Sequence, residues 1–265
     1  FTVRYENIGE LAVQDLTLAI ETDSPFIGDR DYTVLEVGTL AQGESGEAQL
    51  RLRLLPSILQ SQTDVWEALD LTTRAVAGYS LGGTTGQRVV SKSTAVSAPI
   101  TTPVVFESFG RYATPSGVQL GRGPLPPRVG QTTKYWVFWR VGGTINELHN
   151  VHIEGTLAQG VVFTGRQSSS QSGGVEYDAS ANTVRWEASS IAPSLAPTSK
   201  IVGVAFELAL TPDESMVGRA PTLLTDIRLT GTDSRTGAFV SRSGAAVTTE
   251  LPNDLMAGGK SVVRE

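Results

Sequence analysis

The feature that most constrains the fold of this chain is a period-two alternation of apolar and polar residues along almost its whole length. Because successive residues of a β-strand point to opposite faces, each alternating segment predicts a strand with one buried side. Gly, Pro, Ser, Thr and Asn fill the intervals, as they do in the turns of all-β sandwiches. The alternating segments are FTVRYEN (1–7), DLTLAIE (15–21), AQLRLRLL (48–55), ALDLTTRAV (68–76), NVHIEGTL (150–157), NTVRWEA (182–188) and AFELAL (205–210).

Helical spacing is nearly absent. The best exception is SILQSQTDVWEAL (57–69), which predicts at most one or two helical turns. The fold class that follows is all-β.

The two halves of the chain also resemble each other, with the matching segments in the same order. Four matches in series predict duplicated β-sandwich domains at 1–98 and 103–252, joined by the linker SAPITTP (97–103) and followed by a C-terminal tail, 253–265. The matches are AQLRLRLLPS (48–57) with VAFELALTPD (204–213), LDLTTRA (69–75) with TDIRLTG (225–231), VSKS (90–93) with VSRS (240–243), and residues 1–20 with 135–155 after one inserted residue.

Composition narrows the class of protein further. The net charge is −6 and no Lys/Arg-rich run occurs, so a nucleic-acid partner is not expected. The absence of cysteine excludes disulfides, thiol nucleophiles and thiolate metal sites. No run of about 20 apolar residues predicts a membrane span within this chain. The N-terminus lacks a signal-peptide pattern, so we expect any export signal to lie outside it.

Two groups of residues resemble known repeats. The pattern YxVxYxNxG followed by VGTLAQGESGEAQLRLRL resembles the immunoglobulin-like repeats of prokaryotic cell-surface proteins, including the CARDB or conserved-repeat type. LGRGPLPPRVGQTTKYWVFWRV (120–141) with GTDSRTG (231–237) is similar to terminal repeats of large surface proteins in candidate-phylum bacteria. The resemblance implies a secreted array of immunoglobulin-like β-sandwiches and brings no catalytic residue or cofactor. The matching residues of the first pattern are Val3, Tyr5, Asn7, Gly9, Gly38, Leu40, Gly43 and Glu44.

AGYSLGG (77–83) contains the Gly-x-Ser-x-Gly pattern that presents a nucleophilic serine in many hydrolases. There the serine precedes a helix, whereas Ser80 is followed by Gly-rich, β-branched sequence with no helical period. In the second copy the corresponding interval is six residues shorter. We therefore expect residues 77–87 to form an enlarged hairpin loop, in which Ser80 is no nucleophile and Tyr79 and Leu81 are available for contacts. No enzymatic activity is expected.

Two groups of residues suggest metal ligands. Asp23, Asp29 and Asp31 could bind calcium, although aspartates are equally typical of an ordinary loop, which we favour. His149 and His152, the two histidines of the chain, lie three apart on a predicted strand and should face opposite ways. Even with neighbouring glutamates they supply too few ligands, so no metal or cofactor is predicted.

KYWVFWRV (134–141) is the most hydrophobic stretch and places aromatic residues on both faces of one strand. Tyr135 and Trp139 would face the core. Trp136 and Phe138 would face the other way, where they are either covered by a neighbouring domain or loop, which we favour, or form an exposed aromatic platform for a glycan or protein.

The second copy has a strand-like segment, VVFESFGRYAT (104–114), before Tyr135, whereas the first copy begins at Phe1, inside the equivalent strand. Either the sequence is a piece of a longer protein, the alternative we favour, or subunits donate a strand into the gap beside Phe1 and Val3. KSVVRE (260–265), with Val262 and Val263, could be that donor or a disordered tail.

These features together predict two tandem immunoglobulin-like β-sandwich domains of an extracellular, cell-surface protein. The expected function is structural, as a segment of a stalk, fibre or surface layer that polymerises by strand complementation. The expected partners are copies of the chain or adjoining domains of the same surface protein. The alternative is an adhesin-type module that binds a glycan or protein through Trp136, Phe138 or the 77–87 loop.

Overall fold

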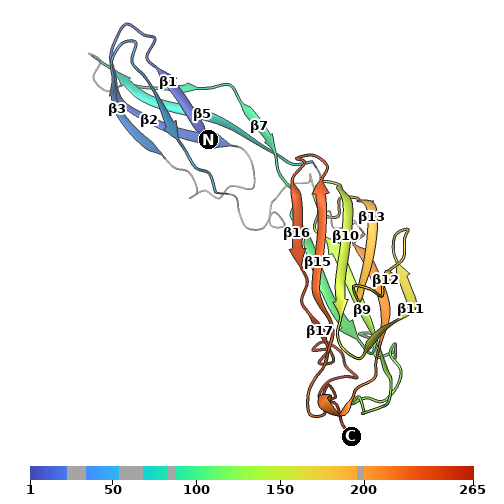
Figure 1. Cartoon of the computed structure of the whole chain (residues 1–265). Coiled ribbons are helices and arrows are strands. Elements are labelled where there is room, and N and C mark those ends of the chain that lie inside the picture. The colour runs from blue at the N-terminus through green and yellow to red at the C-terminus, as the bar shows by residue number, and fades with distance from the viewer. Residues whose placement is uncertain (23–33, 54–67, 83–86, 196–199) are drawn as a thin grey trace. The chain divides into compact units, whose positions relative to one another are not determined.

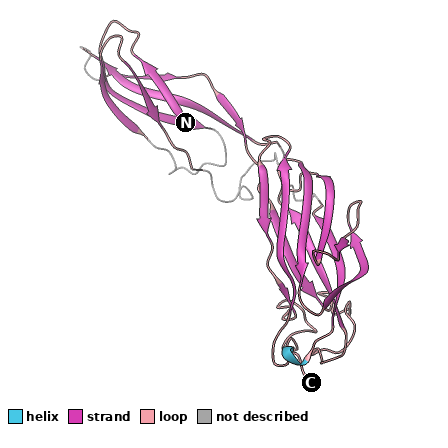
Figure 2. Ribbon diagram, viewed as in Figure 1, coloured by secondary structure: helices cyan, strands magenta, loops and turns pink. Residues whose placement is uncertain are grey.

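The computed structural model describes residues 1–22, 34–53, 68–82, 87–195 and 200–265. Within these ranges the chain is built of β-strands, and the one helical element is a 3-10 turn at Glu214–Met216 (Figure 2). The chain divides into two compact units, Phe1–Ile100 and Thr101–Glu265, so the division lies inside the predicted linker. Most of the segment expected to be helical, 57–67, and the three loop aspartates lie outside the described residues.

The first unit consists of two antiparallel sheets. A two-stranded sheet pairs β1 with β4, and a larger sheet has the order β3–β2–β5–β6, with β7 also paired to β5 (Figure 1). Its core lies between the sheets and includes Leu16, Leu18 and Leu50. The strands are β1 (Thr2–Glu6), β2 (Val13–Thr22), β3 (Leu35–Leu40), β4 (Ser45–Gln49), β5 (Asp70–Leu81), β6 (Arg88–Lys92) and β7 (Val96–Pro99).

The second unit is a larger sandwich with sheet orders β11–β14–β9–β8 and β12–β13–β10–β15–β16, and β17 pairs with β15. Its strands are β8 (Val105–Arg111), β9 (Thr133–Gly142), β10 (Leu148–Leu157), β11 (Val161–Ser169), β12 (Glu176–Asp178), β13 (Thr183–Ile191), β14 (Val202–Leu210), β15 (Thr222–Asp233), β16 (Phe239–Ser243) and β17 (Val247–Thr248).

The strand orders confirm the immunoglobulin-like fold class. In an immunoglobulin sandwich one sheet carries strands A, B, E and D, and the other carries C, F and G. In the second unit β8, β9, β14 and β11 occupy the first four places, and β10, β15 and β16 occupy the other three. In the first unit β1 and β4 occupy B and E, and β2, β5 and β6 occupy C, F and G.

Alternating apolar residues hold the second sandwich together. The inward side chains of β9, Tyr135, Val137 and Trp139, are fully buried, and Trp186 of β13 is buried on the opposite sheet. Trp139 meets the ring of Phe206 edge to face, with centroids 4.8 Å apart. Full burial of such side chains contributes about 2–3 kcal/mol each, so the period-two pattern supplies most of the driving force for this fold.

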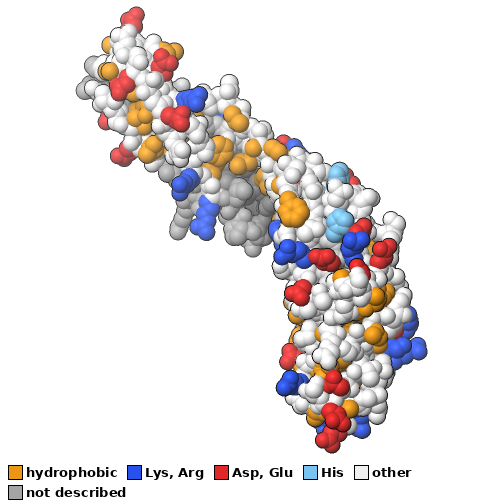
Figure 3. Space-filling view, in the orientation of Figure 1, with side chains coloured by type: hydrophobic (Ala, Val, Ile, Leu, Met, Phe, Trp, Pro, Cys, Tyr) orange, Lys and Arg blue, Asp and Glu red, His pale blue; other side chains and the backbone are white. Residues whose placement is uncertain are grey.

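Both units contain a β-bulge at the same place in the C-position strand. Asp15 in β2 and Asn150 in β10 adopt positive φ angles of 50° and 51°, and the pairing register with the F-position strand shifts there. Asp and Asn tolerate this backbone region better than other non-glycine residues. The bulge puts both His149 and His152 on the exposed side of β10, which corrects the expectation that they face opposite ways. Both histidines are visible on one face in Figure 3.

The structure also corrects the expected position of the serine motif. Tyr79, Ser80 and Leu81 belong to β5, where Ser80 pairs with Gln14 of β2 on one side and Arg88 of β6 on the other. Tyr79 packs against the core of the first unit. The alternation of Ala77, Tyr79 and Leu81 continues the strand, so GYSL is part of the sheet rather than of an enlarged loop.

Residues 253–265 are not a free tail. The Asp254 carboxylate accepts hydrogen bonds from the backbone N–H groups of Tyr112 and Ala113 at 2.6 and 2.7 Å, and from those of Met256 and Ala257, both at 3.0 Å. These bonds fasten the C-terminal segment to the end of β8. Ala257 belongs to the hydrophobic core of the second unit, and Val263 is also buried.

Asn7, from the YxNxG motif, fastens the first unit in a similar way. Its buried amide donates to the carbonyls of Leu11 and Leu40 at 2.9 and 3.1 Å and accepts from the N–H of Gly9 at 3.1 Å. The motif that carries the family resemblance is therefore a set of turn contacts joining the β1–β2 turn to the end of β3.

Asn7→Ala should destabilise the first unit by about 2 kcal/mol, because it leaves a buried carbonyl without its donor. Native-state hydrogen exchange of β1 and β2 amides in the full chain measures this. Gln14→Ala, which removes an exposed amide from β2, is the control and should change stability by less than about 0.5 kcal/mol. Equal effects of the two substitutions would show that Asn7 does not fasten the turn.

Acid should weaken the second unit through Asp254. Burial alone raises the pKa of Asp254, but the hydrogen bonds from Ala113, Tyr112, Ala257 and Met256 outweigh it and hold the pKa below the ordinary 3.8. A depressed pKa contributes stability above the unfolded-state pKa, and this contribution is lost as pH falls from about 3.8 through the folded-state value.

Asp254→Asn should therefore cost about 2 kcal/mol at pH 7 and flatten the decline in stability below pH 4. Urea unfolding followed by tryptophan fluorescence reports on this unit, because Trp139 and Trp186 are buried in it. The matched control is Asp226→Asn, at an exposed position with φ of 50° that Asn tolerates. An unchanged acid profile in Asp254→Asn would refute the role of this carboxylate.

Candidate interaction surfaces

The first candidate surface is the outer edge of β1. Among the described residues β1 pairs with β4 on one side and with no strand on the other. In the second unit the equivalent strand, β9, is paired on both sides, by β14 and β8. The place that β8 occupies in the second sandwich is therefore unfilled in the described part of the first.

A groove of about 520 Å³ lies at this edge, between β1 and the β5–β6 side of the other sheet. Its apolar lining comes from both sheets and includes Val3, Tyr79 and Leu81, three of the residues singled out in the sequence. Phe1 does not line it and is 47% exposed. The other apolar lining residues are Tyr5, Ile8, Val13, Leu16, Leu18, Leu40, Ala75 and Ala77.

Burial differs between equivalent positions of the two units. Val3 and Tyr5 correspond to Val137 and Trp139 in the sequence match, and both pack against the core yet are only half-buried. Val137 and Trp139 are 0% exposed. The apolar face of β1 is thus less completely covered by the described residues than that of β9.

The C-terminal strand candidate is used within the chain. Val263 is 1% exposed, its N–H donates to the carbonyl of Arg219, and its carbonyl accepts from the N–H of Gly218. Val262 points outward and is 41% exposed. The segment KSVVRE is therefore neither a disordered tail nor a strand left available for donation, because Val263 is already buried and hydrogen-bonded within the second unit.

The second candidate surface is the outer face of the sheet β11–β14–β9–β8. Pairing across β8, β9 and β14 places three rows of side chains on this face: Arg111, Trp136 and Glu207; Phe109, Phe138 and Ala205; and Glu107, Arg140 and Gly203. Trp136 and Phe138 are half-buried, so the described residues neither cover them completely nor leave them fully exposed. We name this surface the aromatic face.

Neighbouring aromatic and cationic groups cover part of these rings. Phe109 and Phe138 stack with centroids 5.4 Å apart and planes 12° from parallel. The guanidinium carbons of Arg140 and Arg111 lie 4.9 and 5.4 Å from the Phe109 centroid. That of Arg166 lies 5.6 Å from the Trp136 ring centroid.

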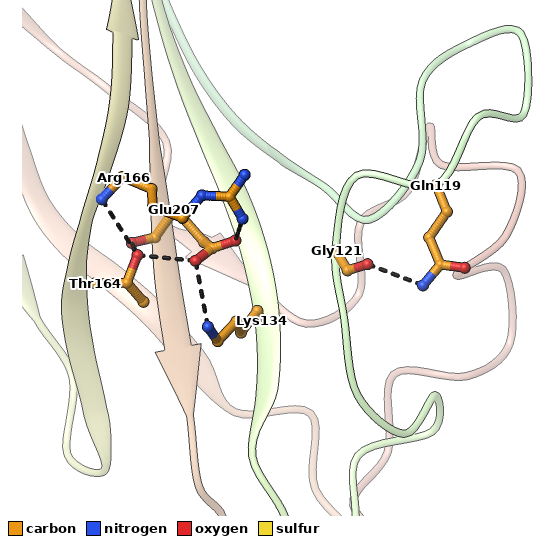
Figure 4. A network of polar contacts seen from close by, with 6 residues as sticks. All are labelled: Gln119, Gly121, Lys134, Thr164, Arg166 and Glu207. Atoms are coloured by element: carbon orange, nitrogen blue, oxygen red, sulfur yellow. Dashed lines mark hydrogen bonds and ion pairs between the residues drawn. The ribbon is translucent and has the colours of Figure 1, made fainter.

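Glu207 is a buried carboxylate on this otherwise solvent-facing side of β14. It accepts from Arg166 Nη1 at 2.9 Å and from the Thr164 hydroxyl at 2.9 Å, and Lys134 Nζ lies 3.6 Å away (Figure 4). The Glu207 side chain is 0% exposed, whereas those of Lys134 and Arg166 are 38% and 53% exposed. Two cations at the surface thus neutralise one buried anion.

The histidines form separate polar pairs. His149 Nε2 lies 3.2 Å from the Glu147 carboxylate, and His152 Nδ1 lies 3.1 Å from that of Glu187. Within the described ranges no group of three or more histidine, aspartate or glutamate side chains is placed to hold a metal ion. In the same ranges no helix has the length and apolar character needed to cross a membrane.

The Glu207 network should respond asymmetrically to mutation. Lys134→Met with Arg166→Met leaves a buried carboxylate without a cation and should cost about 3 kcal/mol. Glu207→Gln leaves two cations that water can solvate and should cost about 1 kcal/mol or less. The triple variant should recover most of the loss in the double variant. Urea unfolding tests this, and a double variant no less stable than Glu207→Gln would contradict it.

No family model and no curated protein sequence matches this chain. Among solved structures it is similar to a D312A variant of BcpA, the major pilin subunit of Bacillus cereus, with TM-score 0.38, 8% identity, and coverage of 94% of this chain and 69% of that chain. The full-length major pilin SpaD of Corynebacterium diphtheriae has a TM-score of 0.32 and 11% identity, with coverage of 89% of this chain and 59% of that chain. The C-terminal domain of AspA, an antigen I/II-family protein of Streptococcus pyogenes, has a TM-score of 0.31 and 12% identity, with coverage of 93% of this chain and 84% of that chain. All three TM-scores are below 0.5, so the proposals below rest on this chain's own residues.

Proposed function

We propose that this chain is a structural segment of a cell-surface stalk, fibre or surface layer, and that its first unit accepts a β-strand along the free edge of β1. The strand comes from residues that precede Phe1 in a longer chain, from an adjoining domain or from another copy of the chain. The observation that carries the proposal is the apolar groove beside an edge of β1 with which no described strand pairs.

Two kinds of interaction would favour strand addition. The outer edge of β1 presents backbone N–H and C=O groups that a new strand can pair with. Apolar side chains at alternate positions of that strand would enter the groove between the sheets. The second unit shows the completed arrangement, in which Val104, directly before β8, belongs to the core and Phe106 of β8 packs against it.

This sheet completion gives the segment a mechanical role rather than a chemical one. We propose no catalytic step. Ser80 lies in β5, a strand paired on both sides, and the Gly-x-Ser-x-Gly pattern there serves the sheet. Extracellular location belongs to the same proposal and follows from the family resemblance.

A peptide with the sequence of residues 104–111, VVFESFGR, should bind the full chain and protect β1 amides from hydrogen exchange, because it supplies the strand that β8 supplies in the second unit. A peptide with Phe106→Asp should bind at least about tenfold more weakly, because an apolar ring would no longer enter the groove. Fluorescence anisotropy gives the affinities, and electron microscopy of the concentrated chain tests for self-assembly.

The control for this experiment is exchange at β9 amides, which should not change because β8 already pairs there. Strand acceptance would be refuted if the chain is a stable monomer at high concentration, its β1 amides are already protected from hydrogen exchange, and it binds neither peptide.

The half-exposed Trp136 and Phe138 favour a second candidate function, that of an adhesin-type binding module. The 77–87 segment contributes less to this candidate than expected, because Tyr79 and Leu81 line the groove of the first unit.

A further inference from the structure

We propose that the aromatic face of the second unit binds an acidic polysaccharide, a chain of sugars that carry carboxylates. This deepens the adhesin-type candidate by naming its ligand class, and it is independent of strand addition at β1.

The composition of the aromatic face favours a saccharide. The solvent-facing side of a sheet normally carries polar residues. Here β9 instead places Trp136 and Phe138 on that side, and β8 places Phe109 beside them. Half-buried aromatic rings in adjacent rows form an apolar ridge rather than isolated surface residues. Aromatic ridges of this kind suit the C–H faces of sugar rings.

Two arginine side chains lie beside the ridge. Arg140 and Arg111 both approach the Phe109 ring, which brings two like charges together. Stacking on a ring fixes the plane of a guanidinium while its N–H groups stay available as donors. One guanidinium N–H group of Arg111 donates a hydrogen bond to the carbonyl of Asn253. Arg140 is exposed and, among the described residues, makes no hydrogen bond or ion pair, so its donors are available for a ligand carboxylate.

The charges in the three rows also favour an acidic ligand. Glu207 adds no net repulsion toward an anion, because Lys134 and Arg166 neutralise its charge. The guanidinium groups of Arg111 and Arg140 outnumber the one exposed carboxylate of these rows, that of Glu107. Two guanidinium groups beside the aromatic rings are complementary to ligand carboxylates.

Small residues stand next to the ridge on β14, where the neighbours of Phe138 and Arg140 are Ala205 and Gly203. A Cβ atom added at Gly203 would meet no atom within 4 Å, so the space at this position is open. A ligand on Phe138 and Arg140 therefore meets no bulky side chain from these two positions.

An acidic peptide would satisfy the charges but suits the position less well. Extended peptides gain affinity by pairing with a strand edge. The ridge centres on β9, whose two edges are already paired to β8 and β14. A saccharide needs ring faces and donors rather than backbone groups, which is what this face provides.

The test uses polygalacturonate as the probe, with fully methyl-esterified polygalacturonate as the neutral control and poly-L-glutamate as the acidic peptide control. The full chain should bind polygalacturonate measurably by calorimetry and bind the other two at least about tenfold more weakly. Arg140→Gln should reduce polygalacturonate affinity about tenfold, the usual effect of losing one charge-assisted hydrogen bond. Arg128→Gln, which removes an exposed charge outside the aromatic face, should leave affinity unchanged.

Each other outcome overturns the proposal. Equal binding of poly-L-glutamate would indicate an acidic protein as partner. Equal losses in Arg140→Gln and Arg128→Gln would indicate general charge attraction, and no binding of polygalacturonate would remove the site. Because Arg140 is exposed, its substitution should not unfold the chain, which thermal unfolding checks. Peptide binding at β1 should be the same in Arg140→Gln and in the unsubstituted chain, so failure here is separate from failure of the strand proposal.

Discussion

The structure depends on one constraint, which is that each sheet must bury its apolar face against the other. In the second unit β8 closes one edge of β9, and Asp254 fastens the C-terminal segment across the end of β8 through four backbone N–H groups. With that edge closed, Val137 and Trp139 are completely buried. In the first unit, where the described residues leave the β1 edge open, Val3 and Tyr5 are only half-buried. The proposed structural role follows from this difference between two sandwiches of the same strand order.

Period-two alternation was sufficient to predict the all-β class and most strands, because the burial of every second residue is a local property of the sequence. The errors came from places where one residue changes the phase. Asn150 forms a bulge, so His149 and His152 share a face that simple alternation separates. The same bulge at Asp15 in the first unit was equally invisible in the alternation, and its recurrence supports the proposed duplication.

The candidate sites were predicted less completely, since they depend on pairing between distant segments. Trp136 and Phe138 were identified because aromatic residues on both faces of a strand are visible in one segment. Arg140, Phe109 and Arg166 were missed, because only the register of β8, β9 and β14 and the approach of β11 bring them to the same face. Glu207 interrupts the apolar run AFELAL, yet nothing local tells whether such a glutamate is exposed or, as here, buried under two cations.

The two proposed surfaces use different parts of the same architecture, which explains how they can coexist in one chain. The β1 edge recognises backbone, so almost any strand with suitably spaced apolar residues can complete it, and specificity must come from the groove. The aromatic face recognises through side chains fixed on paired strands, where the rigid sheet holds rings and guanidinium groups in place before a ligand arrives. An edge that joins segments and a face that holds a ligand therefore place no conflicting demands on either sandwich, because the edge belongs to the first unit and the aromatic face belongs to the second.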